Sequence, residues 1–250
     1  MTSDPGGEDE FIDIRPWPVQ VLVGRLVSLV TLGRRGILEA QESDDLFEAE
    51  TDRFDLESWA ALELQTALAP DEARILHLPV SSLNDDDLAA CADALLAADA
   101  IGWALRVIPS GTLTIPVDAS DEQRILEWSP KPWTRVWPSA RSVRLRSDEE
   151  LAHEREKWDI VTWRLSLFQD PTDLQTDRAA LRDTIAEASA AGLLHTDGDD
   201  LLTDAGASFA HMTDDELSEI DHLARIRLRT LNWVCGFGED WESAPLFLDD

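Results

Sequence analysis

Cysteine, lysine and tyrosine are scarce in this sequence. It has two cysteines, two lysines and no tyrosine, against ten tryptophans. Cys91 and Cys235 are far apart in the chain and form no CxxC pair, so we predict neither a disulfide framework nor a zinc site. Cys91 falls on the apolar stripe of a predicted helix and is expected to be a buried thiol. This cysteine usage favours a reducing, cytoplasmic setting.

Long apolar segments are also missing. The longest apolar run, Val19 to Leu32, is interrupted by Arg25 and is too short to cross a bilayer. Residues 1–10 are acidic and carry neither a basic n-region nor an apolar core, so they do not resemble a signal peptide. We therefore expect no membrane segment, and we expect residues 1–15 to form a flexible acidic N-terminus.

Positive charge is the third shortage. The chain has 51 acidic and 21 basic residues, and its formal net charge is −30. A surface this negative repels phosphates, so nucleic acid is an unlikely partner. The same charge attracts a cationic protein, but it also keeps a protein soluble or adapts it to salt. The sequence leaves these explanations of the acidity open.

The common motifs of catalysis and cofactor binding are absent as well. There is no GxSxG nucleophile elbow, no P-loop, no complete GxGxxG and no HExxH. The five histidines lack the spacing of metal ligands. The sequence therefore predicts no catalytic residues, no cofactor and no metal site.

Helical periodicity is present along most of the chain. Apolar residues recur at intervals of three and four after Pro18, and Gly33 and Gly36 are expected to end this first helix. Residues 41–55 are acidic and weakly patterned and are expected to form a loop or a short frayed helix. Further helices are predicted at 56–68 with Trp59 and Leu62 on one face, from Pro70, from Asn84, from Ser147, from Thr172 to Ala191, and from Thr213 to Cys235. We expect a mainly α, compact multi-helix domain over residues 16–250.

Two stretches depart from this periodicity. The segment 107–146 is rich in proline, tryptophan and arginine, and Leu113, Ile115, Val143 and Leu145 alternate there with other residue types. Alternation is typical of strands, so we predict a small β element at about 110–146. A hairpin is also predicted at 193–203, because Asp-Gly is a favoured turn sequence.

Basic residues and tryptophans gather in this middle segment. Between Arg124 and Arg146 there are six bases and one acid, Glu127. The residues with candidate roles are Trp128, Trp133, Trp137, Arg135, Arg141, Arg144 and Arg146. One interpretation is a binding site for an anion or a protein partner, with stacking aromatic rings. The other is structural: the arginines pair with the chain's own acids while the tryptophans fill a core.

The stretch LNWVCGFGEDWE stands at the end of the last predicted helix. Gly236 occupies the C′ position, where positive φ is favoured, and Gly238 permits a second tight turn. Trp241 is expected to fold back beside Trp233, and the amide of Asn232 to bond free carbonyls or the returning loop. A structural cap explains the stretch, and a ligand pocket is the alternative, since function often resides on loops.

The same C-terminal sequence, RIRLRTLNWVCGFGEDWESAPLFLDD, resembles the signature of the DUF4272 family. The matching residues, for which a structural role is expected, are Asn232, Trp233, Gly236, Gly238, Asp240 and Trp241. VRLRSDEELAHEREKWDIVTWRL is similar to the family's middle helix, and the N-terminal half matches more weakly. The resemblance implies a mostly helical bacterial protein. It carries over no catalytic residues, because the family's function is unknown.

These features favour a cytoplasmic, non-catalytic binding or interaction protein, a class that includes antitoxin- and immunity-like proteins. The alternative is an enzyme that acts on a small anionic substrate held by Arg144, Arg146 and their neighbours. The two hypotheses place the arginines differently. An enzyme needs them to converge in a concave pocket, whereas an interaction protein uses them in surface salt bridges.

Overall fold

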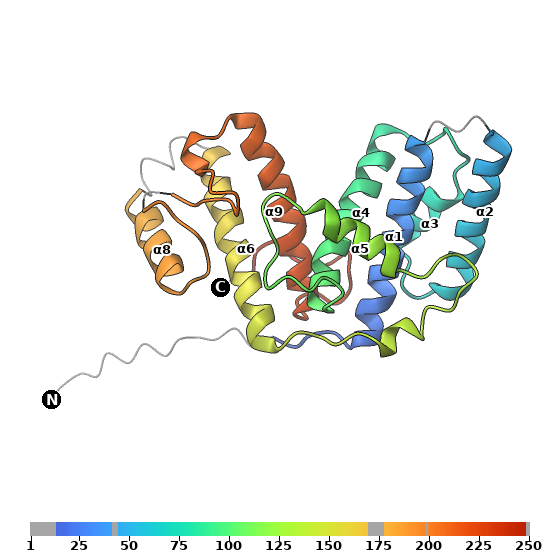
Figure 1. Ribbon diagram of the computed structural model, residues 1–250, viewed down its shortest axis with the longest axis horizontal. Coiled ribbons are helices and arrows are strands. Elements are labelled where there is room, and N and C mark those ends of the chain that lie inside the picture. The colour runs from blue at the N-terminus through green and yellow to red at the C-terminus, as the bar shows by residue number, and fades with distance from the viewer. Residues whose placement is uncertain (1–13, 42–44, 170–177, 199, 249–250) are drawn as a thin grey trace.

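The computed structural model describes residues 14–41, 45–169, 178–198 and 200–248 (Figure 1). The helices are α1 (Val19–Ala40), α2 (Leu46–Glu63), α3 (Pro70–His77), α4 (Asp85–Ala104), α5 (Ala119–Trp128), α6 (Asp148–Gln169), α8 (Arg178–Ala190) and α9 (Asp214–Val234), with 3₁₀ turns η1 (Ser139–Arg141) and η2 (Phe209–His211). Over these ranges no sheet forms, so the predicted mainly α fold is confirmed. None of the described helices is long and apolar enough to cross a membrane.

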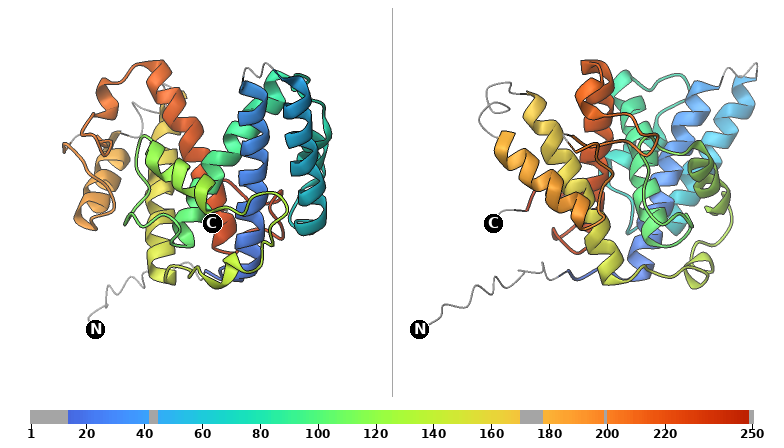
Figure 2. Two further views of the ribbon diagram at one scale, coloured as in Figure 1. Left: turned by 45° about the vertical axis from the view of Figure 1, so that its right-hand side comes forward. Right: turned by 60° about the vertical axis from the view of Figure 1, so that its left-hand side comes forward.

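The helices lie side by side across the molecule, with α4 near the centre. α1 and α9 pack on α4, α6 packs on α9, and α2 and α3 lie on the α1 side (Figures 1 and 2). α8 lies beyond α6 at the opposite end from α2 (Figure 1). The core includes three fully buried tryptophans from three different helices: Trp59, Trp103 and Trp158. Large apolar side chains thus tie together helices that are distant in the sequence.

The two glycines expected to end the first helix lie inside it. α1 continues to Ala40. A Cβ atom on Gly33 would lie 2.3 Å from a methyl carbon of Leu95, and one on Gly36 would lie 2.6 Å from the Cβ of Cys91. Both contacts are with α4, so these glycines allow α1 and α4 to approach closely. Packing, not helix termination, explains them.

Of the two alternatives predicted for 41–55, the loop is wrong where the structure describes it: residues from Leu46 onward belong to a full-length helix, α2. α2 begins at Leu46, because the side chain of Asp45 caps it by accepting hydrogen bonds from the amides of Phe47 and Glu48. Only part of the predicted apolar face of this helix is buried: Trp59 is 1% exposed but Leu62 is 70% exposed. The helix buries one narrow side, since few of its apolar residues face α1 and α3.

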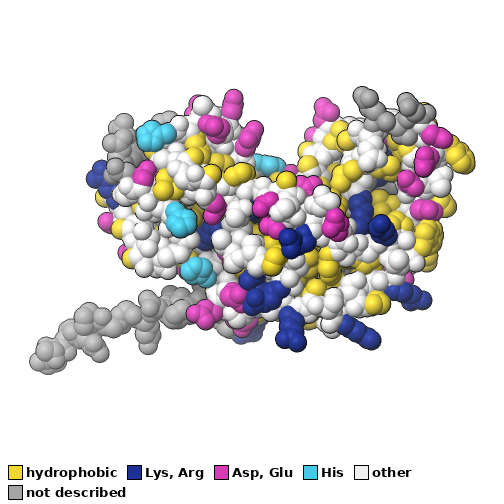
Figure 3. Space-filling model, viewed as in Figure 1, with side chains coloured by type: hydrophobic (Ala, Val, Ile, Leu, Met, Phe, Trp, Pro, Cys, Tyr) yellow, Lys and Arg dark blue, Asp and Glu magenta, His cyan; other side chains and the backbone are white. Residues whose placement is uncertain are grey.

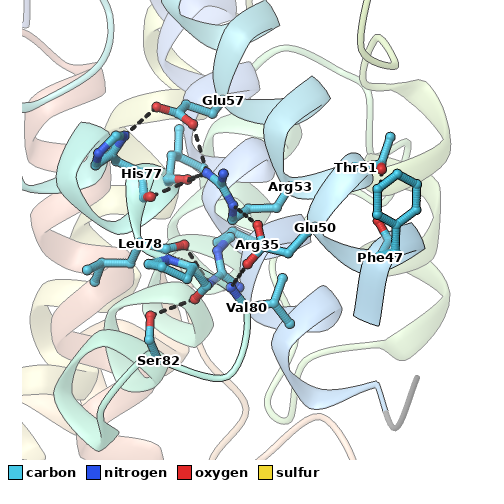
Figure 4. A network of polar contacts seen from close by, with 12 residues as sticks. Arg35, Phe47, Glu50, Thr51, Arg53, Glu57, His77, Leu78, Val80 and Ser82 are labelled. Carbon is cyan, nitrogen blue, oxygen red and sulfur yellow. Dashed lines mark hydrogen bonds and ion pairs between the residues drawn. The ribbon is translucent and has the colours of Figure 1, made fainter. Parts of the chain in front are cut away.

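Polar contacts complete the packing of α2 against its neighbours (Figure 4). Arg53 donates hydrogen bonds to Glu50 and Glu57 on its own helix and to the backbone carbonyl of Leu76 at the end of α3. Arg35, from α1, donates to the carbonyl of Pro79 just beyond α3. Two arginines thus bind the free carbonyls at the C-terminal end of α3, as expected for cations near a helix C-terminus.

The predicted β element at 110–146 is replaced by an extended segment, α5 and η1. Leu113 and Ile115 are buried, as alternation suggested, but their amides bond side chains and not another strand. The amide of Leu113 donates to Glu154 at 3.0 Å, and that of Ile115 donates to Asp204 at 2.6 Å. Side chains from other parts of the chain therefore satisfy backbone groups that a sheet would otherwise have paired.

Local signals predicted the remaining boundaries well. Asn84 caps α4, the Ser147–Glu150 box precedes and opens α6, and the Thr213–Glu216 box opens α9. The predicted hairpin at 193–203 is reduced to an isolated bridge between Thr196 and Leu201, followed by a second one from Leu202 to Ser208. The predicted box of Thr172 and Gln175 lies outside the described residues.

Candidate functional site

The end of α9 is built as a glycine cap. The amide of Gly236 donates to the carbonyl of Trp233 at 2.9 Å, and the amide of Phe237 donates to that of Asn232 at 3.0 Å. These two bonds, with φ of +91° at Gly236, form a Schellman motif. The cap turns the chain sharply, so that the residues after it return over the helix end.

The N-terminal segment lies against this cap. The amide of Arg15 donates to the carbonyl of Cys235 at 2.8 Å, and the amide of Trp17 donates to that of Val234 at 3.2 Å. Residues 14–15, predicted to belong to a flexible terminus, are therefore held in place. The contact stacks Trp17 on Trp233, with ring centroids 6.1 Å apart.

The returning loop is fixed by Asn232 and Arg229. The Asn232 amide nitrogen donates to the carbonyls of Pro245 and Leu246, while its oxygen accepts from Arg155 at 2.7 Å. Arg229 donates to the carbonyl of Trp241 at 3.2 Å. Trp241 then lies edge-on to Trp233, with ring centroids 5.2 Å apart. The stretch is thus the structural cap that its sequence suggested.

A cavity of about 510 Å³ opens beside this cap, and we call it the Trp cleft. Its lining residues are Trp17, Gln20, Val21, Gly24 and Arg25 near the start of α1, Thr66 to Pro70 before and at the start of α3, Trp137, and Trp233 with Glu239 to Glu242. Four tryptophans from three distant segments therefore meet around one space. The stretch LNWVCGFGEDWE is both a helix cap and one wall of a cavity.

Arg25 closes one side of the Trp cleft and is already paired. Its guanidinium makes a two-pronged ion pair with Glu72, one branch of which is 2.9 Å long, and it stacks 4.2 Å from the ring of Trp241. Burial lowers the pKa of Arg25, while hydrogen bonding to Glu72 counteracts this effect. Because Glu72 neutralises Arg25, the cation does not define the charge of the cleft.

Glu239, Asp240 and Glu242 define that charge, and we call them the acidic rim. All three are exposed and all three line the Trp cleft, so they lie at its mouth. Ser243 fixes Asp240: the Ser243 amide donates to the Asp240 carboxylate, and the Ser243 hydroxyl donates to the Asp240 backbone carbonyl. Hydrogen bonding to the side chain and backbone of Ser243 lowers the pKa of Asp240. The site therefore combines aromatic walls with a negative entrance.

The aromatic walls also contain buried hydrogen-bond donors. The indole N–H groups of Trp17 and Trp233 are buried, and no described residue accepts a hydrogen bond from either. Trp233 as a whole is 3% exposed. A buried donor without an acceptor costs roughly 1–3 kcal/mol. Both N–H groups are closed to solvent, so they add no accessible donor to the cleft.

The tryptophans of the middle segment lie in different environments. Trp137 lines the Trp cleft and is 46% exposed, while Trp133 is 57% exposed and lies outside the cleft lining. Trp128 ends α5 and is partly buried against the core. The core-filling interpretation therefore applies to Trp128 and not to the other two.

The arginines of the middle segment also differ in burial and in partners. Arg146 is buried, donates to the carbonyls of Trp103 and Ser110, and pairs with Glu150, so it is structural. Arg135 lies 3.7 Å from Glu63 and its side chain is 81% exposed. The exposed Arg141 and Arg144 form no ion pair with any described residue. The predicted set is thus not brought together.

A second cavity, of about 490 Å³, lies between α6, residues 111–115 and residues 192–204. It contains Lys157, whose pKa is lowered by burial. The Lys157 ammonium donates to the hydroxyl of Thr112 and the carbonyl of Leu113, both at 2.6 Å, and lies 3.4 Å from Glu154. These contacts occupy its hydrogens and hold the 111–115 segment on α6.

Comparison of the chain with protein-family models, with curated proteins and with solved structures finds no match. The resemblance to the DUF4272 family therefore stays a prediction. Within the described ranges, no three of the His, Cys, Asp and Glu side chains are placed to hold a metal ion together.

Sequence patterns missed more than half of the residues that line the Trp cleft. Trp17, Val21, Arg25 and the Thr66–Pro70 stretch gave no local signal of a site, because each reads as ordinary helix or loop. Only folding brings them to the C-terminal cap.

Proposed function

We propose that the protein is a cytoplasmic, non-catalytic binding protein that takes up a cationic protein partner in the Trp cleft. The observation that carries this proposal is a tryptophan-walled cavity whose mouth is lined by three exposed carboxylates. An apolar side chain of the partner enters the cleft, and neighbouring basic side chains of the partner lie against the acidic rim. An immunity- or antitoxin-like role is one member of this class.

Two further observations support a protein partner. Val21 and Trp137 are 42% and 46% exposed where they line the cleft, so they offer apolar surface to a partner, and tryptophan is typical of interface hot spots. The net charge of −30 also steers a cationic protein toward the molecule.

The enzyme hypothesis gains less support from this arrangement. It requires Arg144, Arg146 and their neighbours to converge on a small anion. Arg146 is instead bound by backbone carbonyls and Glu150, and Arg144 lines neither of the two cavities.

Synthetic peptides without tryptophan test the proposal, because the protein's own fluorescence then reports binding. The first peptide has one phenylalanine flanked by two lysines on each side. The second has alanine in place of phenylalanine, and the third has glutamates in place of the lysines. We expect the first to bind at least about tenfold more tightly than either of the others, a difference of about 1.4 kcal/mol.

A pair of variants locates the binding. Val21→Arg places a cation in the cleft and is expected to weaken the first peptide by about tenfold. Leu62→Arg makes a comparable change at an aliphatic residue that is 70% exposed on α2, away from the cleft lining, and serves as the control. Equal binding of the phenylalanine and alanine peptides, with no difference between the two variants, would show that only net charge attracts the peptides.

A further inference from the structure

Trp133 is held in an unusual position at the surface. It is 57% exposed, and its φ is +67°, in the left-handed region that residues with a Cβ rarely adopt. Pro132 precedes it, and the hydroxyl and amide of Thr134 both bond the carbonyl of Lys131, which tightens the turn. Trp133 thus combines a strained backbone conformation with a large apolar side chain that is exposed to solvent.

Exposed basic residues flank this tryptophan in the sequence. From Trp128 to Ser147 the sequence has no acidic residue, in a chain with 51 acids. The exposed bases of this stretch, which we call the basic strip, are Lys131, Arg135, Arg141 and Arg144. In Figure 3 the Lys and Arg side chains gather along the lower edge of the molecule, where this stretch crosses from the region of η1 to α6 in Figure 1.

Trp133 and the basic strip have the chemistry that the Trp cleft accepts. The cleft needs an apolar anchor flanked by cations, and Trp133 is an exposed anchor flanked by Lys131 and Arg135. We infer that a second copy of this chain is an occupant of the Trp cleft, with its Trp133 in the cleft and its basic strip on the acidic rim. The inference rests on the proposed binding role of the cleft.

The position of the strip makes the contact reciprocal. Trp137 lines the cleft and follows Trp133 by four residues, so their Cα atoms are at most about 14 Å apart. Donor and acceptor surfaces therefore adjoin on each copy. A two-fold axis near Trp137 lets each copy place its Trp133 in the cleft of the other, as in an isologous dimer.

Another exposed apolar surface fits self-association less well. Phe47 and Phe54 are 82% and 57% exposed and lie seven residues apart, hence on one face of α2, whose apolar side chains reach the right-hand edge of Figure 3. Acidic residues from Glu48 to Asp55 border this face on the same helix. Two copies joined through α2 would therefore bring like charges together, whereas the strip and the rim carry opposite charges.

Sedimentation velocity over a range of concentrations tests the inference, at about 0.15 M salt so that the repulsion between two acidic proteins is screened beyond about 8 Å. The wild type is expected to shift from monomer toward dimer as its concentration rises. Trp133→Ala and Val21→Arg are each expected to weaken the association at least tenfold. Arg124→Ala, at an exposed arginine of α5 outside the strip, is the control and is expected to leave it unchanged.

Mixing the two variants gives the decisive measurement. Trp133→Ala keeps an intact cleft and Val21→Arg keeps an intact Trp133, so the mixture is expected to associate more strongly than either variant alone. A wild type that stays monomeric overturns the inference, and so does a dimer that is lost in Phe47→Ser but not in Trp133→Ala. Either result leaves the peptide titration to decide the proposed function, because that measurement does not depend on a second copy.

Discussion

A Cβ atom on Gly236 would lie 2.2 Å from the carbonyl oxygen of Arg15. The N-terminal segment and the cap of α9 therefore meet at a point where only glycine fits. We expect Gly236→Ala to lower the free energy of unfolding by about 3 kcal/mol, since left-handed strain of roughly 1–2 kcal/mol adds to overpacking of about 1–3 kcal/mol. Denaturant unfolding measures the change.

Gly206→Ala separates the two contributions. Gly206 has a φ of +82°, but a Cβ atom there meets nothing within 4 Å. This variant is expected to lose only the strain, about 1–2 kcal/mol. Equal losses in the two glycine variants would mean that the contact with Arg15 adds nothing.

Gly36→Ala tests the close packing of α1 on α4. Alanine favours a helix by about 1 kcal/mol, but the new Cβ would lie 2.6 Å from that of Cys91, and such overpacking costs about 1–3 kcal/mol. We expect a net loss of up to about 2 kcal/mol by thermal or denaturant unfolding. In Gly24→Ala, on the same helix, the nearest atom is 3.4 Å away, so stability should rise. A rise in both variants would contradict the packing explanation.

The buried ion pair of Arg227 and Asp99 joins α9 to α4. Arg227 is 1% exposed, bonds Asp99 at 2.5 Å and the carbonyl of Thr114 at 2.7 Å, and stacks 4.6 Å from the ring of Trp158. Arg227→Leu leaves the Asp99 carboxylate buried without its cation, so we expect a loss of about 3–5 kcal/mol. The double variant with Asp99→Leu should lose less than the sum of the single losses, and strict additivity would refute the coupling.

Both thiols are expected to be unreactive in the folded protein. Burial raises the pKa of Cys91 to about 11 and that of Cys235 to about 12. At pH 8 neither thiolate is significantly populated, and neither sulfur is accessible to a reagent. A colorimetric disulfide reagent should therefore detect no thiol in native protein and two in guanidinium. Rapid reaction of one thiol before unfolding would show that its helix opens.

The capping box of α6 should make the stability of the fold depend on pH. The hydrogen bond from the amide of Ser147, with help from the Ser147 hydroxyl and Arg146, lowers the pKa of Glu150. Above the unfolded value, about 4.3, the carboxylate contributes fully to stability, and its contribution is lost as the pH falls through the lowered folded value. The difference in melting temperature between wild type and Glu150→Gln should be largest near pH 7 and shrink below about pH 4. A difference that is constant from pH 7 to pH 3 would count against a charged cap.

Local signals in the sequence determined where most helices begin and how the last one ends. Asn84, Ser147 and Thr213 cap helices because their side chains bond backbone amides within three residues, and such contacts need no tertiary partner. Gly236 acts in the same way at the end of α9. The mainly α fold follows from these signals together with the helical spacing of apolar residues.

Tertiary structure decided the outcomes that depend on partners distant in the chain. Leu113 and Ile115 alternate like strand residues, yet Glu154 and Asp204 satisfy their amides and no strand forms. Glycine at position 33 is typical of a helix end, yet Gly33 lies inside α1. It is needed there because Leu95 of α4 packs against it.

The Trp cleft is the clearest case of this dependence. The sequence marks Trp137 and Trp233 in two separate motifs and gives no signal at Trp17. They line one cavity only because the N-terminal segment hydrogen-bonds to the end of α9 and the middle segment crosses beside it. A local pattern reports contacts within one helix turn. Contacts over more than a hundred residues are fixed by which buried surfaces fit together, and only the folded chain carries that information.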